Sequence, residues 1–256
     1  MAHTLTSEKN ILAHIKEVDR QLSLLRLLRT VEWGGAVVCL AVGLVYRFVY
    51  DGSWLLAGLG ALFLFFALGH AGRIAEAEAE ADDLARRRDA KQRVAALLDE
   101  KLANDHYVLN DIHLKVGREK CWIDHVVVAP SGIFVIATLP WTGKVIGDTA
   151  RRAHHWKIKD PSGAIRPARN PVSKVVRQRR ILCNWLKGTD LIWENVRTIV
   201  VLADPTVEID VLNAKDLVCT PDRAIGYIND FCFNTPVLSN PEVESLAKGL
   251  NDRTAV

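Results

Sequence analysis

The segment IDHVVVAPSGIFVIATLPWTGKV, residues 123–145, decides the fold of this chain. It begins with Asp124 and His125 at the head of an apolar run. The chain then turns at Pro130, Ser131 and Gly132 and is apolar again as far as residue 136. Two short apolar runs joined by proline and glycine are typical of neighbouring β-strands. The segment therefore predicts a strand–turn–strand unit with a carboxylate on its first strand.

The rest of residues 106–256 alternates between strand-like and helical patterns. A largely apolar run at residues 196–203 is typical of a central strand buried on both faces. Asn170 and Pro171 form a helix start, with a capping side chain followed by proline in the first turn. The order predicts an α/β domain whose mixed sheet is covered by helices. Strands are expected at residues 107–114, 123–128, 133–136, 196–203 and 216–220, with 143–146 extending the same sheet, and helices at 172–186, 221–231 and 241–250.

Apolar residues are concentrated near the beginning of the chain. Hydrophobic residues make up 49% of the sequence and mean hydropathy is +0.08, although 25% of the residues are charged. Residues 34–46 and 53–69 carry no charge, and they approach the roughly 20 residues of a membrane span when the first takes in residues 31–33 or 47–50. We expect a transmembrane helical hairpin at residues 31–70, with Asp51 and Gly52 at its tip. The alternative is a helical pair buried in a soluble core.

Basic residues flank both ends of this predicted hairpin. Lysine and arginine near a membrane stay on its cytoplasmic side. We therefore expect a protein of the cell membrane, inner or plasma, that crosses the lipid bilayer twice and keeps both termini and the α/β domain in the cytoplasm. The 5 cysteines form no CxxC pair, which agrees with a reducing compartment. The flanking basic residues are Lys9, Lys16, Arg20, Arg26 and Arg29 before the hairpin, and Arg73, Arg86, Arg87, Arg88, Lys91 and Arg93 after it.

Helices are also expected on either side of the hairpin. Ser7 is an N-cap for an amphipathic cytoplasmic helix, in which apolar residues recur every three or four positions, as in a helix that packs on another. The segment after the hairpin is rich in alanine, glutamate and arginine, with acidic residues first and basic residues later, which favours a charged helical stalk. The predicted order is the amphipathic helix at 1–30, the hairpin at 31–70, the stalk at 71–105 and the α/β domain at 106–256.

The α/β part of the chain resembles the NERD domain, the nuclease-related domain of the PD-(D/E)XK nuclease superfamily. The block IDHVVVAPSGIFVI at residues 123–136 carries most of the resemblance. The resemblance implies a restriction-endonuclease-like mixed sheet with flanking helices, preceded here by the hairpin and the stalk. Further marks follow in the same order, and they are VLND at residues 108–111, Gly143-Lys144, Trp156, Asn170-Pro171 and the apolar strand at 196–203.

The resemblance also implies a site, which this chain has largely lost. In that superfamily, an aspartate and a glutamate hold one or two divalent metals, and a lysine two residues after the glutamate positions or activates the attacking water. The pattern places the aspartate at Asp124, the glutamate at Ala137 and the lysine at Leu139. An acidic residue of the preceding helix falls near Ala90-Lys91, and a glutamine after the Asn-Pro pair falls at Lys174. Only Asp124 matches, so the site is expected to be degenerate.

The remaining aspartate is a poor metal site by itself, because magnesium prefers several hard oxygen ligands. Asp111, on the neighbouring predicted strand, and Asp148 are the two acids that could supply a second carboxylate. We therefore expect no metal and no cofactor. Magnesium enters the expectation only if one of these two acids restores nuclease activity.

Two basic runs, at residues 151–159 and 166–180, would flank the groove of a nuclease fold. There they would contact phosphates of nucleic acid without reading its sequence. The alternatives are anionic lipid headgroups, an acidic protein surface, or a basic face that is simply solvated. The formal net charge of +3 does not decide among them. The candidate contact residues are Arg151, Arg152, Lys157, Lys174, Arg177 and Arg180.

The sequence thus predicts a membrane-anchored, catalytically inactive nuclease-related protein. Its expected role is that of an interaction or scaffold subunit, whose partner is another membrane protein. The alternative is a membrane-tethered, metal-dependent nuclease or a non-specific DNA-binding protein.

Overall fold

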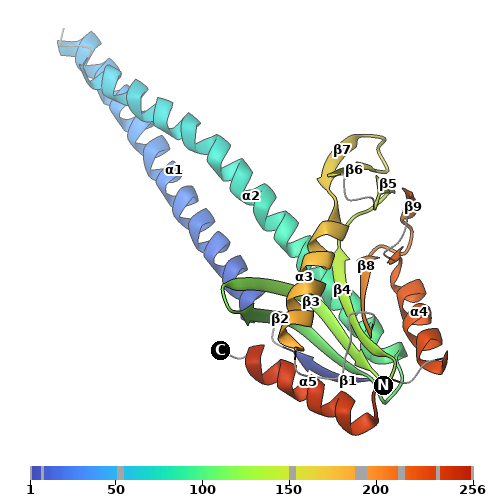
Figure 1. Cartoon of the computed structure of the whole chain (residues 1–256). Helices are drawn as coiled ribbons and strands as arrows, with labels where there is room; N and C mark the ends of the chain where they lie inside the picture. Colours follow the sequence, from blue (N-terminus) through green and yellow to red (C-terminus); the bar gives the residue numbers. More distant parts are fainter. Residues whose placement is uncertain are drawn as a thin grey trace. The chain divides into compact units, whose positions relative to one another are not determined.

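The computed structural model describes residues 2–6, 9–50, 55–149, 154–187, 195–212, 217–234 and 237–254 (Figure 1). The chain divides into two compact units, one formed by Ile11–Ala85 and the other by Met1–Asn10 together with Arg86–Val256. We call the first the paired-helix unit and the second the α/β unit. The elements are β1 (His3–Thr6), α1 (Lys9–Tyr50), α2 (Leu55–Lys101), β2 (Tyr107–Val116), β3 (Glu119–Ala129), β4 (Gly132–Leu139), β5 (Lys144–Asp148), β6 (His155–Lys159), β7 (Ile165–Arg169), α3 (Pro171–Trp185), β8 (Val196–Leu202), β9 (Glu208–Leu212), β10 (Leu217–Cys219), α4 (Pro221–Asn234) and α5 (Asn240–Thr254).

A mixed sheet is the centre of the α/β unit. Among the described strands, six form it in the order β1-β2-β3-β4-β8-β10. β2, β3 and β4 are antiparallel neighbours, whereas β8 is parallel to β4, β10 to β8 and β1 to β2. The expected strand–turn–strand unit is confirmed, with Ala129 paired to Gly132 across the turn. Gly132 has a φ of +126°, and a Cβ there would lie 2.3 Å from the carbonyl oxygen of Asn195, so the turn requires glycine.

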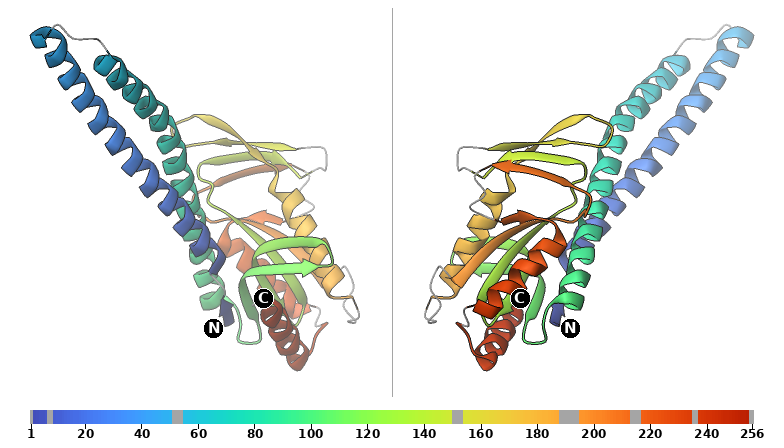
Figure 2. Two further views of the ribbon diagram at one scale, coloured as in Figure 1. Left: turned by 90° about the vertical axis from the view of Figure 1, so that its left-hand side faces the viewer. Right: turned by 90° about the vertical axis from the view of Figure 1, so that its right-hand side faces the viewer.

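Helices cover both faces of this sheet (Figures 1 and 2). One hydrophobic core joins Val126 and Val128 of β3 to side chains of α3 and α5, including Ile181 and Val243. The other core joins Val127 of the same strand to side chains of α2 and α4. Successive residues of a strand point to opposite faces, so the central strands are apolar on both sides. This is why residues 126–129 and 199–203 are continuous apolar runs in the sequence.

The last turns of α2 belong to the α/β unit. Ala90, Val94 and Leu98 lie four residues apart on one side of the helix, and all three are buried in the core shared with α4. The sequence placed the beginning of the domain at residue 106, because residues 71–105 looked like one charged stalk. In the structure the compact unit also includes Arg86 onward, because a narrow apolar edge of the helix packs on the sheet.

A second sheet was not predicted. Among the described strands, four form it in the order β7-β6-β5-β9. The expectation that residues 143–146 extend the main sheet was wrong, because β5 pairs with β6 and with β9 instead. β6 has the sequence HWKIK, in which only Trp156 and Ile158 are buried, so its alternation was hidden within a basic run. β1, with the sequence HTLT, was also missed because so short and polar a segment has little strand signal.

The paired-helix unit consists of α1 and the first part of α2 (Figure 2). Val18 and Leu22 of α1 are buried against Ile74 of α2, which agrees with this part of the apolar spacing expected in the first helix. A Cβ on Gly60 would lie 2.7 Å from Leu40 Cγ and 2.9 Å from Leu40 N, so glycine allows the two helices to approach closely. An exposed ion pair joins Arg26 Nη2 to Glu78 Oε1 at 2.6 Å, but such surface pairs add little stability.

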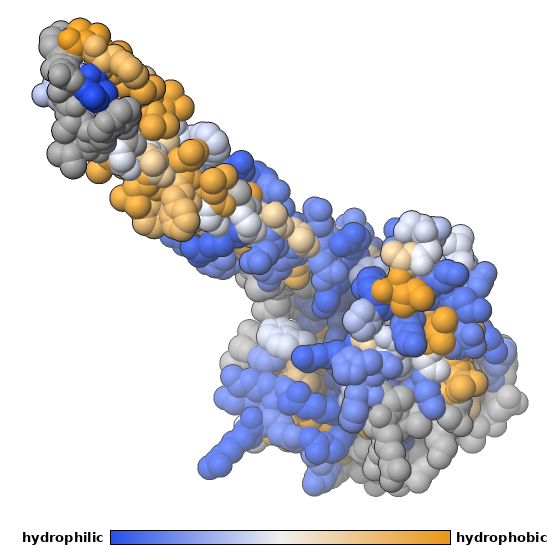
Figure 3. All heavy atoms as spheres, turned by 90° about the horizontal axis from the view of Figure 1, so that it is seen from above, coloured by the Kyte–Doolittle hydropathy of each residue, from blue (hydrophilic) through white to orange (hydrophobic). Residues whose placement is uncertain are grey.

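Apolar side chains remain exposed on this unit (Figure 3). The segment Lys16–Val49 of α1 contains an 18-residue window whose mean hydropathy is 1.5 and of which 11% is buried. Among the described residues it is the one helix that is long and apolar enough to cross a membrane. Val38, Val42 and Phe48 of α1 and Phe65 of α2 are half or more exposed. The expected tip at Asp51 and Gly52, and the expected N-cap Ser7, lie outside the described residues.

Candidate functional site

The candidate site forms where the regular alternation of side chains between the two faces of the sheet is interrupted in both β2 and β3. Leu109 and Ile112 of β2 belong to the same core although they are three residues apart, and so do Ile123 and Val126 of β3. A regular strand would place same-face residues two apart. Asp111 and Asp124 lie within these breaks, in the register that sets the two residues opposite each other. The local twist therefore brings two carboxylates together.

Asp111 has an unusual backbone conformation. Its φ is +57°, and it is the only non-glycine residue with a positive φ among the described residues. This left-handed region costs an ordinary side chain free energy, although aspartate tolerates it better than most. The conformation interrupts the ladder between Asn110–His125 and Ile112–Ile123. The strain is thus located at one of the two carboxylates.

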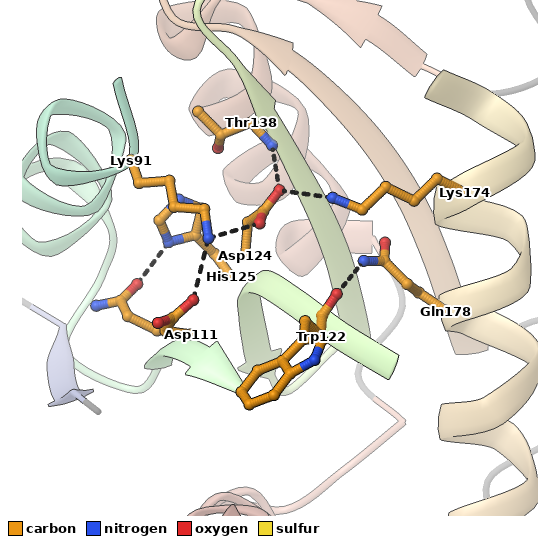
Figure 4. Close-up of polar contacts among 9 residues, drawn as sticks. Lys91, Asp111, Trp122, Asp124, His125, Thr138, Lys174 and Gln178 are labelled. Carbon is orange, nitrogen blue, oxygen red and sulfur yellow. Dashed lines mark hydrogen bonds and ion pairs between the residues drawn. The ribbon is translucent and has the colours of Figure 1, made fainter. Parts of the chain in front are cut away.

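Lys91 of α2 contacts both carboxylates (Figure 4). Its Nζ lies 2.8 Å from Oδ1 of Asp124 and 3.0 Å from Oδ1 of Asp111. The side chain of Lys91 is only 19% exposed, and those of Asp111 and Asp124 are 9% and 5% exposed. Burial disfavours the charged amine, but attraction to Asp124 and Asp111 outweighs it and raises the pKa of Lys91. Lys91 is therefore an ammonium shared between two carboxylates.

Asp124 has two further partners. Its Oδ2 accepts a hydrogen bond from the backbone N–H of Thr138 at 3.0 Å, and lies 3.6 Å from Nζ of Lys174 on α3. Burial alone would raise the pKa of Asp124, but the positive charges of Lys174 and Lys91 outweigh burial and lower it. Asp124 is therefore an ionised carboxylate whose oxygens are already occupied by donors.

His125, the neighbour of Asp124, points to another partner. Its Nδ1 lies 2.6 Å from Oδ1 of Asn110, so the imidazole N–H donates to the amide oxygen. Burial lowers the pKa of His125 to about 4, with Asp124 opposing the change and Lys91 reinforcing it. The imidazole is neutral at pH 7. The structure thus supports His125 as a sheet residue with a side-chain partner.

Positions Ala137 and Leu139 offer no chemistry. Ala137 on β4 is 1% exposed and belongs to the apolar core under α3, and Leu139 is a partly buried member of the same core. Neither side chain can bind a metal or move a proton. Asp148 does not complete the site either, because it ends β5 in the second sheet, where its carbonyl oxygen accepts from Trp156 Nε1 and Asn170 Nδ2. Asp111 is therefore the acid that joins Asp124.

The local charge disfavours a divalent metal. Two carboxylates, Asp111 and Asp124, are balanced by two ammonium groups, Lys91 and Lys174. Magnesium would add two positive charges beside groups that are already positive, and it would find few free oxygen ligands. Within the described ranges, no group of three or more His, Cys, Asp or Glu residues is arranged to hold a metal ion. The residues present do not fit a magnesium site.

Two members of the site were not predicted in their roles. Lys91 lies in a charged segment that is typical of a solvent-exposed helix face, and the sequence does not show which side of that helix faces the sheet. Gln178 lies one turn after Lys174 on α3, is buried, and donates from Nε2 to the backbone oxygen of Trp122 (Figure 4). The expected glutamine was placed at Lys174, so the four-residue period of a helix was the signal that could have found it.

The structure brings together only some of the basic residues that the sequence suggested as contacts for nucleic acid or a partner. Lys174, Arg177 and Arg180 form an exposed stripe on α3, but Lys174 faces Asp124 and Arg180 is paired with Glu119. Lys157 is exposed on β6 of the second sheet. Arg151 and Arg152 lie outside the described residues. The described members therefore present less free positive charge than the sequence alone suggested.

Comparison with known proteins agrees with this architecture. Residues 86–203 match the family model described as NERD, nuclease-related domain. The match begins at Arg86, which is also the first residue of the second segment of the α/β unit. The matched range includes Lys91, Asp111 and Asp124. No curated protein and no solved structure matches the chain.

Proposed function

Residues 86–203 form a NERD, or nuclease-related, domain, and we propose that in this chain it does not cleave nucleic acid but serves a membrane-anchored interaction subunit. The observation that carries the first half of the proposal is the Lys91 ammonium, which lies between Asp111 and Asp124. Phosphodiester cleavage by a metal requires a cation that neutralises phosphate charge and activates water. Because Lys91 and Lys174 together already balance the two carboxylates, the site has little remaining negative charge to attract a metal.

The lost positions support the same conclusion. Ala137 lies in an apolar core, where no carboxylate is available as a second ligand from β4. Leu139 has no amine to position a water molecule. Here β4 supplies neither the second metal ligand nor the amine at residue 139, and both oxygens of Asp124 are already occupied by donors. The domain keeps the fold without the groups that the reaction requires.

The arrangement of the chain supports a membrane hairpin. Residues before α1 and residues from Arg86 onward belong to one compact unit, and a compact folded unit lies on one side of a bilayer. The intervening helices must therefore cross an even number of times if they cross at all. One span, by length and composition, lies in α1, and α2 carries exposed Leu62, Phe65 and Leu68 as the returning span. Basic residues near both ends favour a cytoplasmic α/β unit.

The same helices offer a surface to a membrane partner. Gly60 and Gly35 face the other helix of the pair, Gly60 next to Leu40 and Gly35 next to Phe63. Gly34 and Gly58, by contrast, have no atom within 4 Å of a Cβ placed there. Small residues with open space allow close approach of a neighbouring transmembrane helix. We propose another membrane protein as the partner of this surface.

A cleavage assay on the full chain in detergent tests the absence of activity. Single-stranded and double-stranded DNA and RNA would be incubated with Mg²⁺ or Mn²⁺, with an Asp124→Ala variant as the matched control. We expect no cleavage by the wild type beyond that of the control. Metal-dependent cleavage that Asp124→Ala abolishes would overturn the proposal. Salt-sensitive binding without cleavage would instead support the DNA-binding alternative.

A labelling experiment tests the hairpin. A single cysteine at Asp51, in a chain whose other cysteines are replaced by serine, would be exposed to a membrane-impermeant maleimide added to intact cells. A second single cysteine at Lys120, in the α/β unit, is the control. We expect labelling at residue 51 and protection at residue 120 until the membrane is permeabilised. Labelling of both positions, or of neither, in intact cells would contradict this topology.

A further inference from the structure

We propose that the ammonium of Lys91 is a built-in cation that takes the place of a divalent metal between Asp111 and Asp124, and that a divalent-cation site appears when this ammonium is removed. The inference rests on the proposed function, because it explains how the domain dispenses with a metal. It also assigns Lys91 a positioning role, since one side chain fixes the end of α2 to two strands of the sheet.

The geometry around Lys91 is that of a cation site. The two Oδ1 atoms converge on one nitrogen from opposite strands, at 2.8 and 3.0 Å. Calcium binds carboxylate oxygens at about 2.3–2.6 Å and magnesium at about 2.0–2.1 Å. Each carboxylate would therefore have to move by less than about 1 Å to hold a divalent ion at the same point. The pairing of β2 with β3 brings the carboxylates there, since Asp111 and Asp124 lie between the pairs Asn110–His125 and Ile112–Ile123.

Several residues of this cluster carry buried polar atoms without partners. Oδ2 of Asp111 and Nε2 of His125 have no hydrogen-bond partner, and these residues are 7% and 1% exposed. Oε1 of Gln178 and Oγ1 of Thr138 are also buried without partners. Buried polar atoms are rarely left without partners in folded proteins. With Nδ1 of His125 donating to Asn110, all four atoms can accept hydrogen bonds from water or, for Asp111 and His125, face a cation.

In a domain without catalysis, a lysine ammonium holds the two carboxylates together more dependably than a metal ion that can dissociate. The amine is covalently attached, so the cation is present at any metal concentration. Together with Lys174 it balances the two carboxylates, whereas removal of Lys91 leaves two buried negative charges facing a mostly exposed lysine. Uncompensated buried charges are strongly destabilising. A divalent cation is then the ligand that restores the balance.

The test uses the full chain in detergent and Mn²⁺ as the probe. Thermal unfolding with and without Mn²⁺ would be compared for the wild type, for Lys91→Gln and for Lys91→Gln combined with Asp111→Asn. We expect no response from the wild type. Lys91→Gln should unfold at a lower temperature, recover part of the loss with Mn²⁺, and bind Mn²⁺ at least tenfold more tightly than the wild type by electron paramagnetic resonance. The double variant should not respond.

Several outcomes would overturn the inference. A folded Lys91→Gln chain that ignores Mn²⁺ would do so, and so would a wild type that responds as strongly as the variant. Lys91→Met, which keeps the length of the side chain, is the second variant. If both variants fold poorly, their folded yield should rise with Mn²⁺ in the refolding buffer, and an unchanged yield would equally reject the site.

The inference and the proposed function fail separately. Metal-dependent cleavage by the wild type would overturn the proposed function. Absence of Mn²⁺ binding in the Lys91 variants would overturn only the inference. Lys91→Gln should bind Mn²⁺ without cleaving DNA, because Ala137 and Leu139 still supply neither a ligand nor an amine.

Discussion

Nζ of Lys91 lies 2.8 Å from Oδ1 of Asp124, so the carboxylate that a metal-dependent nuclease would use for its ion is bound to a side-chain ammonium. Lys91 is on the last turns of α2 and Asp124 is on the central strand β3. The contact therefore links the helix to the sheet at the point where chemistry would occur. Under the proposed function, this ion pair joins two elements of the fold where a nuclease would hold its metal.

The two carboxylates should contribute unequally to stability. Asp124 contacts Lys91, Lys174 and the backbone of Thr138, whereas Asp111 is paired with Lys91. Asp124→Asn should lower the free energy of unfolding by about 3 kcal/mol, because it leaves a buried ammonium short of a partner. Asp111→Asn should cost about 1 kcal/mol, because the asparagine still accepts a hydrogen bond and tolerates a positive φ. Denaturant unfolding of the full chain in detergent measures both values, and equal costs would contradict this ranking.

His125 should make stability depend on pH. Its pKa is about 4 in the folded chain and about 6.5 in the unfolded chain, so the unfolded state binds the proton first as pH falls. The contribution of His125 to the free energy of unfolding should therefore be fully present above pH about 6.5 and decline as the pH falls towards about 4. Below pH about 4 this contribution should change no further, and its total loss should be about 3 kcal/mol. The measurement is the free energy of unfolding across this range.

The matched control for this pH dependence is His125→Asn, whose side-chain nitrogen can take the place of Nδ1 beside Asn110. The variant should show a flatter profile between pH about 6.5 and 4, because residue 125 no longer titrates there. Identical slopes for the two proteins would show that His125 does not cause the decline. Asp124 does not account for this slope, because its pKa is lowered and its protonation lies at more acidic pH.

Restoring the missing glutamate should not restore the enzyme. Ala137 is 1% exposed in an apolar core, so Ala137→Glu buries either a charge or an oversized neutral acid. We expect a loss of about 3 kcal/mol or more in the free energy of unfolding, and no gain of metal-dependent cleavage while Lys91 is present. Ala137→Gln has the same size without the charge and separates the two costs. A stable and active Ala137→Glu chain would contradict the assignment of this position to the core.

Gly60 should be required for the pairing of α1 and α2. Gly60→Ala places a Cβ against both Leu40 and its backbone nitrogen, and should cost about 1–3 kcal/mol through forced separation of the helices. Gly58→Ala is the matched control, because its Cβ would have no neighbour within 4 Å. The readout is disulfide formation between cysteines at Arg26 and Glu78. Equal cross-linking in the two variants would rule out close contact at Gly60.

The sequence predicted the main sheet because its strands are buried on both faces. Residues 126–129 and 133–136 are apolar and are separated by Pro130, Ser131 and Gly132, so both strands and their turn were identified. The second sheet was missed because its strands are short and carry basic side chains on the exposed face. β6 alternates between buried and exposed residues, but its five residues lie in a run that reads as a charged loop.

The site was predicted only in part, for a physical reason. Asp124 could be located because it precedes a continuous apolar run. The role of Lys91 could not be inferred, because a charged helix looks the same whether a lysine faces water or a carboxylate. The position of Asp111 beside Asp124 depends on the pairing of β2 with β3, which no single segment reveals. A cation held between distant parts of the chain is a property of the fold and not of any one segment.

The most direct test of this account is a Mn²⁺ titration of the wild-type full chain in detergent, followed by electron paramagnetic resonance at neutral pH. If Lys91 holds the cation position between Asp111 and Asp124, the signal of free Mn²⁺ should rise in proportion to the metal added, as it does for Asp124→Asn. Loss of one equivalent of that signal in the wild type, restored by Asp124→Asn, would show that the site binds a metal and would contradict the account.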